Sequence, residues 1–204
     1  MYVVMEMKAE MMKYVLESAV FIYIAKASVE EFRAYLKRRR NKQPFKKAFL
    51  DISKIYELMN NIMVDTRAHR IIIYRSHNGG GKPKLGKPLY CTAQYEVYHS
   101  SRSKKRDWHA QELDNGYVNL LSKVDQKSVV DLFLDTMPEG ILKADYFGDN
   151  VTCAVVFKVH ETTSNFYFLE IRHQSKVDIS GPVYKNVCRP YLNSIKMLFA
   201  NSDD

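Results

Sequence analysis

A chain of 204 residues can form one domain with an extension or two small domains, and its 46% of apolar residues exclude a chain that is disordered throughout. The net charge of +8 favours an anionic partner, whether nucleic acid, a phosphorylated small molecule or an acidic protein. The three cysteines, Cys91, Cys153 and Cys188, are too widely spaced for a structural zinc site, and we expect them to be reduced thiols in a cytoplasmic protein.

The positive charge is concentrated in residues 67–110, which carry ten basic and two acidic side chains. Residues 111–204, by contrast, carry nine basic and thirteen acidic side chains. This uneven distribution indicates a basic surface that suits an anionic partner. A solvated basic face that only keeps the protein in solution is an equally open interpretation.

The first forty residues repeat apolar side chains at intervals of three and four, which predicts one interrupted helix or two helices. The charge run 37–42 is followed by Pro44, where a helix should stop. We therefore expect a helical extension over residues 1–45 and an α+β domain over residues 46–204. Residues 1–27 do not resemble a signal peptide, and their uncharged stretch is too short to span a membrane, so we expect no membrane partner.

A long helix is predicted from Lys46, because apolar residues recur along one stripe of it. These residues are Phe49, Ile52, Ile55, Tyr56, Met59, Ile62 and Met63. The stripe either packs against the sheet described next or pairs with its copy in a second chain. A homodimer through the N-terminal helices is therefore one of two open arrangements.

Two strands joined by a long loop follow this helix. β-Branched and aromatic residues occupy 70–74 and 89–98, and the eleven-residue loop 78–88 is rich in glycine, proline and lysine. The loop is about twice the usual length, and so it is a candidate binding element. It is not a phosphate-binding P-loop, because Pro83 and a strand follow Lys82.

Three polar residues of the second strand, Thr92, Gln94 and Glu96, alternate with apolar residues. Because successive side chains of a strand point to opposite faces, we expect all three on one face. If protein covers this face, the three side chains need partners, which favours a wet or ligand-filled pocket. An edge strand with that face in water is the alternative.

A strongly basic loop over residues 100–107 leads to Trp108 and His109, and Trp108 is the only tryptophan of the chain. Basic side chains beside an aromatic ring suit a phosphate-bearing ligand or a single nucleic-acid strand. Alternatively, Trp108 only anchors the return of the loop to the core. The candidate residues for nucleic acid or another anion are Lys82, Lys84, Lys87, Arg102, Lys104, Lys105 and Arg106.

The second half of the chain is predicted to contain two helices, three strands and a closing helix. The helices are placed at 113–124 and 129–134, the strands at 141–147, 151–160 and 166–173, and the closing helix at 183–200 with a kink or restart at Pro190. Short linkers between consecutive strands indicate antiparallel neighbours. The fold class is therefore α+β, with a single, mostly antiparallel sheet of about five strands covered by helices on both faces.

This order of elements, from about Phe49 to Ala200, resembles the GAF family, which shares its sheet-and-helix plan with PAS-type sensor domains. The resemblance implies a sensing module with a pocket between the sheet and the central helices. In this sequence the pocket would be lined by Thr92, Gln94, Glu96, Trp108, His109, Asp145, Tyr146 and Phe147. The Asn-Lys-Phe-Asp-Glu signature of cyclic-nucleotide-binding members is absent, so the resemblance names no ligand and no cofactor.

No catalytic signature is present: the chain lacks the Gly-x-Ser-x-Gly elbow and the dinucleotide fingerprint. Four histidines near the predicted hairpin have no carboxylate partners at fixed spacing, so we expect no metal site. The first hypothesis is a non-catalytic sensor or regulatory module that binds a small molecule or a protein partner. The alternative is a nucleic-acid-binding protein that uses the basic surface around residues 82–106, and an enzyme is the third choice.

Overall fold

The computed structural model describes residues 26, 29–33, 44–79, 87–99 and 108–201. The chain divides into two compact units, residues 1–50 and residues 51–204. In the first unit, residues 29–33 are helical and exposed, which agrees with the prediction there. The rest of the predicted N-terminal helices and the charge run 37–42 lie outside the described residues.

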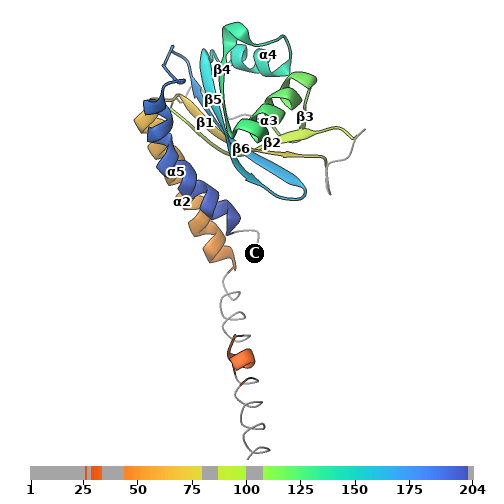
Figure 1. The fold of residues 1–204 in the computed structure, drawn as a ribbon, viewed down its shortest axis with the longest axis vertical. Helices are drawn as coiled ribbons and strands as arrows, with labels where there is room; N and C mark the ends of the chain where they lie inside the picture. Colours follow the sequence, from red (N-terminus) through yellow and green to blue (C-terminus); the bar gives the residue numbers. More distant parts are fainter. Residues whose placement is uncertain (1–25, 27–28, 34–43, 80–86, 100–107, 202–204) are drawn as a thin grey trace, which may run out of the picture. The chain divides into compact units, whose positions relative to one another are not determined.

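Within the described part of the chain, six strands form one sheet whose neighbours are all antiparallel (Figure 1). In the order β3-β2-β1-β6-β5-β4, the strands are β3 (Gln111–Glu112), β2 (Tyr90–Tyr98), β1 (Arg70–His77), β6 (Asn165–His173), β5 (Cys153–Glu161) and β4 (Val129–Phe133). The predicted fold class is confirmed, with six strands in place of about five. The predicted hairpin is β1 and β2, and it pairs with β6 through β1.

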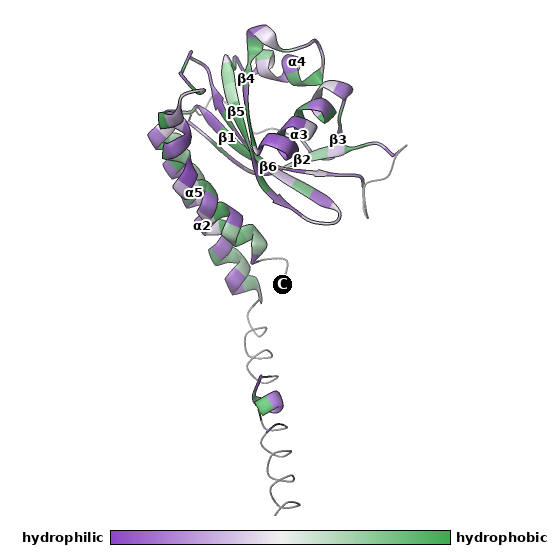
Figure 2. Cartoon of the chain, in the orientation of Figure 1, coloured by the Kyte–Doolittle hydropathy of each residue, from purple (hydrophilic) through white to green (hydrophobic). Residues whose placement is uncertain are grey.

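Helices cover both faces of this sheet (Figure 1). On one face lie α2 (Pro44–Thr66), from Asp51 onward, and α5 (Pro182–Ala200); on the other lie α3 (Asn115–Lys127) and α4 (Ile141–Gly148). Both α2 and α5 mix hydrophobic and hydrophilic residues along their length, as helices with one buried side do (Figure 2). None of the helices within the described ranges is both long and apolar enough to cross a membrane.

The apolar stripe of α2 packs into the core between the helices and the sheet. Ile55, Met59 and Ile62 are almost completely buried there, together with Ile195 and Phe199 of α5. Of the two arrangements that the sequence left open, core packing therefore holds for the part of α2 that belongs to the second unit. Pairing with a second chain stays a prediction.

Residues 129–134 form an edge strand and a turn, so the helix predicted there is wrong. Helix α3 ends at Lys127, and the left-handed backbone of its C-cap Ser128 (φ 62°) turns the chain into β4. The strand begins with Val129 and Val130, and β-branched residues suit a strand better than a helix. A single-turn 3₁₀ helix, η1 (Leu134–Thr136), follows it.

Residues 141–148 form a helix, so the strand predicted at 141–147 is also wrong. The apolar residues that pack inward, Leu142 and Tyr146, are four positions apart and therefore share one helix face. The helix begins where the backbone N–H of Ile141 donates to a side-chain oxygen of Asp114, at 2.8 Å. This cap comes from a residue 27 positions earlier in the chain, which local patterns do not reveal.

Candidate ligand site between the sheet and helix α4

The space between the sheet and α4 holds six charged side chains among apolar ones. Two are arginines, Arg70 and Arg172, and four are carboxylates, Glu96, Asp145, Asp149 and Glu170. Five of the six side chains are at most 7% exposed, and Asp149 is 18% exposed. We call these six residues the charged cluster.

The strand register brings the cluster together. Arg70 of β1 lies opposite Arg172 of β6, and Ile72 of β1 lies between Glu96 of β2 and Glu170 of β6. Side chains two apart along a strand, or opposite each other across a pair, share one face. The other two carboxylates come from α4, which contributes Asp145 and ends at its C-cap, Asp149.

Arg172 is completely buried and lies at the centre of the charged cluster. Its Nη2 lies 2.9 Å from Glu170 Oε2 and 2.8 Å from Asp145 Oδ2, and its Nη1 lies 3.1 Å from Asp149 Oδ2. The guanidinium also lies over the ring of Tyr146, at 4.7 Å from the ring centroid. Burial is the largest single influence and lowers the pKa of Arg172, but Glu170, Tyr74 and Tyr117 together outweigh it and hold the pKa above its ordinary value.

Arg70 extends the charged cluster toward the β2 side of the sheet. Its Nη1 lies 3.1 Å from Glu96 Oε1 and 3.3 Å from Asp149 Oδ2. Its guanidinium lies 5.7 Å from the ring centroid of Tyr98. Asp149 therefore contacts both arginines through one carboxylate oxygen.

Hydroxyl groups of tyrosines connect the charged cluster to the residues around it. The hydroxyl of Tyr146 donates to Glu170 Oε1, and Arg172 Nη2 donates to the hydroxyl of Tyr74, at 3.1 Å. The Tyr74 ring stacks on Phe168, with centroids 5.1 Å apart. An aromatic layer thus borders the charges on the same side of the sheet.

Two buried polar atoms of this region make no hydrogen bond within the described part of the chain. They are the hydroxyl of Tyr117 and the Nε of Arg172, and both residues are completely buried. Burial, followed by the neighbouring Tyr74 and Glu170, raises the pKa of Tyr117 well above its ordinary value. Most buried polar groups have a partner, so two without one in the same region favour a bound water or ligand.

The expectation that Thr92, Gln94 and Glu96 share one face is wrong, because β2 has a bulge. The pairing passes from Ile73 opposite Tyr95 to Tyr74 opposite Ala93, so Gln94 has no partner on β1. One inserted residue reverses the faces beyond it. Glu96 therefore joins the charged cluster, Gln94 is exposed, and Thr92 lies on the opposite face.

Thr92 is buried at the far end of the hairpin. Its hydroxyl accepts from the backbone N–H of Ala110 at 3.1 Å and lies 3.1 Å from His77 Nε2. His109, which precedes Ala110, is exposed. Neither Thr92 nor His109 contacts the charged cluster in the contacts that the structure shows.

The remaining predicted pocket residues divide between the interior and the surface. Asp145 and Tyr146 lie within the site, whereas Phe147 is 76% exposed. Trp108 is half-buried, and its ring lies 5.5 Å from the rings of both Tyr74 and Tyr117. Trp108 therefore packs in the aromatic layer, which agrees with an anchor for the loop before it.

Sequence reasoning missed Arg70, Asp149, Glu170 and Arg172. A signal was present, since Glu170 and Arg172 interrupt an apolar strand at alternate positions. Charged side chains on a strand that is covered on both faces must be paired inside the protein. Their partners come from β1, β2 and α4, so the charges reveal the site but not its composition.

Of the residues proposed for nucleic acid or another anion, Lys87 lies in the described part of the chain and is exposed. The others, Lys82, Lys84, Arg102, Lys104, Lys105 and Arg106, lie outside it. The nucleic-acid alternative therefore stays a prediction. Within the described ranges, no group of three or more metal-ligating side chains is arranged to hold an ion.

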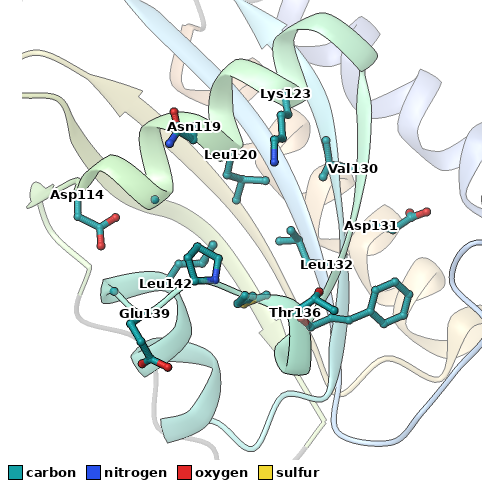
Figure 3. Close-up of a pocket in the computed structure, with 15 residues that line it drawn as sticks. Asp114, Asn119, Leu120, Lys123, Val130, Asp131, Leu132, Thr136, Glu139 and Leu142 are labelled. Carbon is teal, nitrogen blue, oxygen red and sulfur yellow. Dashed lines mark hydrogen bonds between the residues drawn. The ribbon is translucent and has the colours of Figure 1, made fainter.

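A groove of about 270 Å³ lies beside the site, between α3, β4 and the start of α4 (Figure 3). Leu120 and Leu132 extend into it from α3 and β4, and Asp131 points away from it (Figure 3). Asp114 lies at one end, and its carboxylate accepts from the backbone N–H of Tyr117 at 2.9 Å as well as from Ile141. One carboxylate thus ties together the first turns of α3 and α4.

Comparisons by sequence find no relative: no protein-family model matches the chain, and no curated protein does. Solved structures share its fold at low identity. A GAF domain of a two-component sensor histidine kinase from Bacillus halodurans is 12% identical, with a TM-score of 0.50 over 72% of this chain and 94% of that one. The GAF domain/HD domain protein from Geobacter sulfurreducens is 9% identical, with a TM-score of 0.54 over 75% and 94%.

A third similar structure is the blue-light absorbing form of the PixJ GAF domain from Thermosynechococcus elongatus. It is 10% identical, with a TM-score of 0.53 over 78% of this chain and 92% of that one. The fold of this chain is therefore GAF-like, as the order of its elements predicted.

Proposed function

We propose that this chain is a non-catalytic sensor or regulatory module that binds a small molecule at the sheet face beneath α4. The alternative ligand is a protein partner, and the experiment below distinguishes the two. The fold supports this proposal, because similar structures include a domain of a sensor histidine kinase and a light-absorbing domain. The three cysteines are buried free thiols, which supports a cytoplasmic location.

The observation that carries the proposal is the buried charged cluster. Desolvating an ion costs several kcal/mol, and replacing a buried ion pair by apolar side chains is often neutral or stabilising by about 1–4 kcal/mol. Stability alone therefore gives no reason for six charged side chains between the sheet and α4. Charged side chains that gather in a fold's interior, where their desolvation is costly, are instead typical of functional sites.

Helix α4 is the element that would respond to a ligand. It has eight residues, and its buried apolar side chains are Leu142 and Tyr146. It also contacts the sheet through the ion pairs of Asp145 and Asp149, and through the hydroxyl of Tyr146, which donates to Glu170. A ligand that competes for the arginines would weaken these contacts and shift the position of α4.

Native mass spectrometry and thermal unfolding of the purified full chain test the proposal. We expect a discrete small-molecule mass on the protein, and a melting temperature that rises by roughly 5–10 °C when that molecule is present at a hundred times its Kd. A complex with a second macromolecule would identify a protein partner instead. A chain that carries no ligand, and whose melting temperature no metabolite mixture or cell fraction changes, would contradict the proposal.

The variant Glu170→Gln locates the binding. It removes a carboxylate that competes with the ligand for Arg172 and retains the size of the side chain, so we expect tighter ligand binding. Asp125→Asn is the matched control, because Asp125 contacts Lys158 on the surface and not the cluster. Equal binding by both variants would place the ligand elsewhere on the protein.

A further inference from the structure

We infer that Arg70 and Arg172 form an anion-binding site, which the carboxylate of Asp149 occupies in this structure. The ligand of the module would then carry a carboxylate or phosphate group that takes the place of Asp149. The ligand's identity as an anion rests on the proposed function, whereas the anion site itself rests on the geometry of the cluster.

The position of Asp149 is that of an anion held between two cations. Its Oδ2 lies 3.3 Å from Arg70 Nη1 and 3.1 Å from Arg172 Nη1. Glu96 contacts Arg70, and Asp145 and Glu170 contact Arg172. A single anionic oxygen at the position of Asp149 therefore contacts both guanidinium groups at once, beside these three carboxylates.

This position is also the one nearest to solvent. Asp149 is 18% exposed, whereas Asp145 is 7% exposed and Glu170 is 1% exposed. An anion from solution would reach the arginines at Asp149 before it met the other carboxylates.

The helix itself gives no reason for a carboxylate there. Asp149 is the C-cap of α4, where the backbone carbonyls carry partial negative charge and a cation is preferred. Its side chain lies at this helix end because the two arginines attract it. The attraction of Asp149 to the two arginines therefore outweighs its repulsion by the carbonyl end of α4. A ligand anion that is not part of the helix would not be held at that helix end.

A free anion would also form a contact that Asp149 does not. Arg172 reaches Asp149 through Nη1, while its Nε is buried and makes no hydrogen bond within the described residues. Carboxylates and phosphates bind guanidinium groups through two parallel hydrogen bonds. An untethered carboxylate or phosphate could accept from Nη1 and Nε together.

Chemical rescue of the full chain carrying Asp149→Ala tests this inference. We expect the melting temperature to fall by roughly 5–10 °C, because two buried arginines lose the ion pairs that they share with Asp149. Sodium formate or sodium phosphate should restore at least half of that loss, and sodium chloride at the same ionic strength should not. A larger effect of formate indicates a carboxylate ligand, and a larger effect of phosphate indicates a phosphorylated one.

Asp125→Ala is the matched control, since it removes the same charge from a surface ion pair with Lys158. We expect formate and phosphate to act on it no more than chloride does. If Asp149→Ala does not fold, Asp149→Asn removes the charge and keeps the side-chain volume, and the same three salts are compared. Equal effects of all salts on the Asp149 variant that folds would overturn the inference.

The outcomes for the two proposals can be separated. A small molecule bound to the wild-type chain without selective rescue of the variant would retain the sensor function and overturn the anion site. Selective rescue would support the anion site even if the wild-type chain carried no ligand. The absence of a ligand on the wild-type chain would count against the sensor function.

Discussion

The hydroxyl of Tyr117 has the unusual property of being completely buried without a hydrogen-bond partner among the described residues. Leaving such a group unpaired costs about 1–3 kcal/mol. We therefore expect Tyr117→Phe to leave the free energy of unfolding unchanged or to raise it by about 1 kcal/mol, as measured by urea denaturation. The same variant should weaken binding of a ligand that uses this hydroxyl.

Tyr184→Phe is the matched control for Tyr117→Phe. The hydroxyl of Tyr184 is also buried, but it shares a hydrogen bond of 2.6 Å with His173 Nε2. Its removal leaves the imidazole without that partner and should lower stability by about 1–2 kcal/mol. A loss of that size in Tyr117→Phe would show that its hydroxyl is satisfied in solution.

The bulge at Gln94 shows where residue-level prediction failed. Alternation along β2 correctly marked Glu96 as a polar side chain on a covered face. It failed for Thr92, because the inserted residue is defined by the pairing with β1 and not by β2 itself. A pattern within one strand contains no information about a register that a second strand imposes.

Among the elements, α3 and α4 depend on one carboxylate. Asp114 accepts from the backbone N–H of Tyr117 and of Ile141, and a Cβ on Gly140 would lie only 2.5 Å from its Oδ2. Each cap contributes about 0.5–2 kcal/mol, so Asp114→Ala should lower the free energy of unfolding by about 2–3 kcal/mol. Urea denaturation followed by circular dichroism measures this loss.

Asp178→Ala provides the comparison for Asp114→Ala. Asp178 accepts from the backbone N–H of Gly181 before α5, at an exposed position and with a bond of 3.2 Å. We expect this variant to lose less than about 1 kcal/mol. Similar losses in the two variants would refute the double-cap role of Asp114.

Helix α5 continues through Pro190, where a kink or restart was expected. Proline has no N–H for the carbonyl four residues earlier, and an interior proline costs a helix about 3 kcal/mol relative to alanine. Pro190 is exposed, so Pro190→Ala removes little packing. We expect it to raise the free energy of unfolding by about 1–3 kcal/mol in urea denaturation.

Pro182 supplies the control for this prediction, because it opens α5. A proline in the first turn of a helix lacks an N–H that would have no helical partner anyway. Pro182→Ala should therefore change stability by less than about 0.5 kcal/mol. A loss of stability in Pro190→Ala would mean that the ring fixes a helix geometry that the core requires.

The exchange of helix and strand over residues 129–148 has one physical origin. Each of these two elements, β4 and α4, is eight residues long or shorter, and apolar residues in so short a stretch fit both periodicities. Tertiary contacts decide between them: β5 pairs with β4, and Asp114 caps α4. The longer elements, α2, α3 and α5, were predicted correctly because several turns repeat the same pattern.

For the whole molecule, the order of elements was a better guide than the assignment of each one. The hairpin, the central segment, the last two strands and the closing helix retain their order although β4 and α4 were exchanged. The fold depends on this order and on short antiparallel connections. The site depends on side-chain pairing across three strands and α4, which is why the fold was predictable and the charged cluster was not.

The stability of the whole molecule should fall as the pH falls from 6.5 toward 4. Burial lowers the pKa of His173 to about 4, and burial is also the largest influence on His69, whose pKa is likewise about 4. Between these values and the ordinary pKa of 6.5, the unfolded chain binds more protons than the folded one. The stability that comes from keeping His69 and His173 neutral is therefore fully present above pH 6.5. It is lost as the pH falls toward 4, by about 1.4 kcal/mol per pH unit for each histidine.

Urea denaturation at intervals between pH 7.5 and pH 5 measures this slope in a range where ordinary carboxylates, with pKa values of about 4, stay ionised. His173→Gln should reduce the slope by about half, since His69 then remains as the contributing group. His99 is exposed, so His99→Gln should keep the wild-type slope. If His173→Gln also keeps the wild-type slope, His173 is protonated in the folded protein, and its hydrogen bond to Tyr184 must then run from the imidazolium to the hydroxyl oxygen.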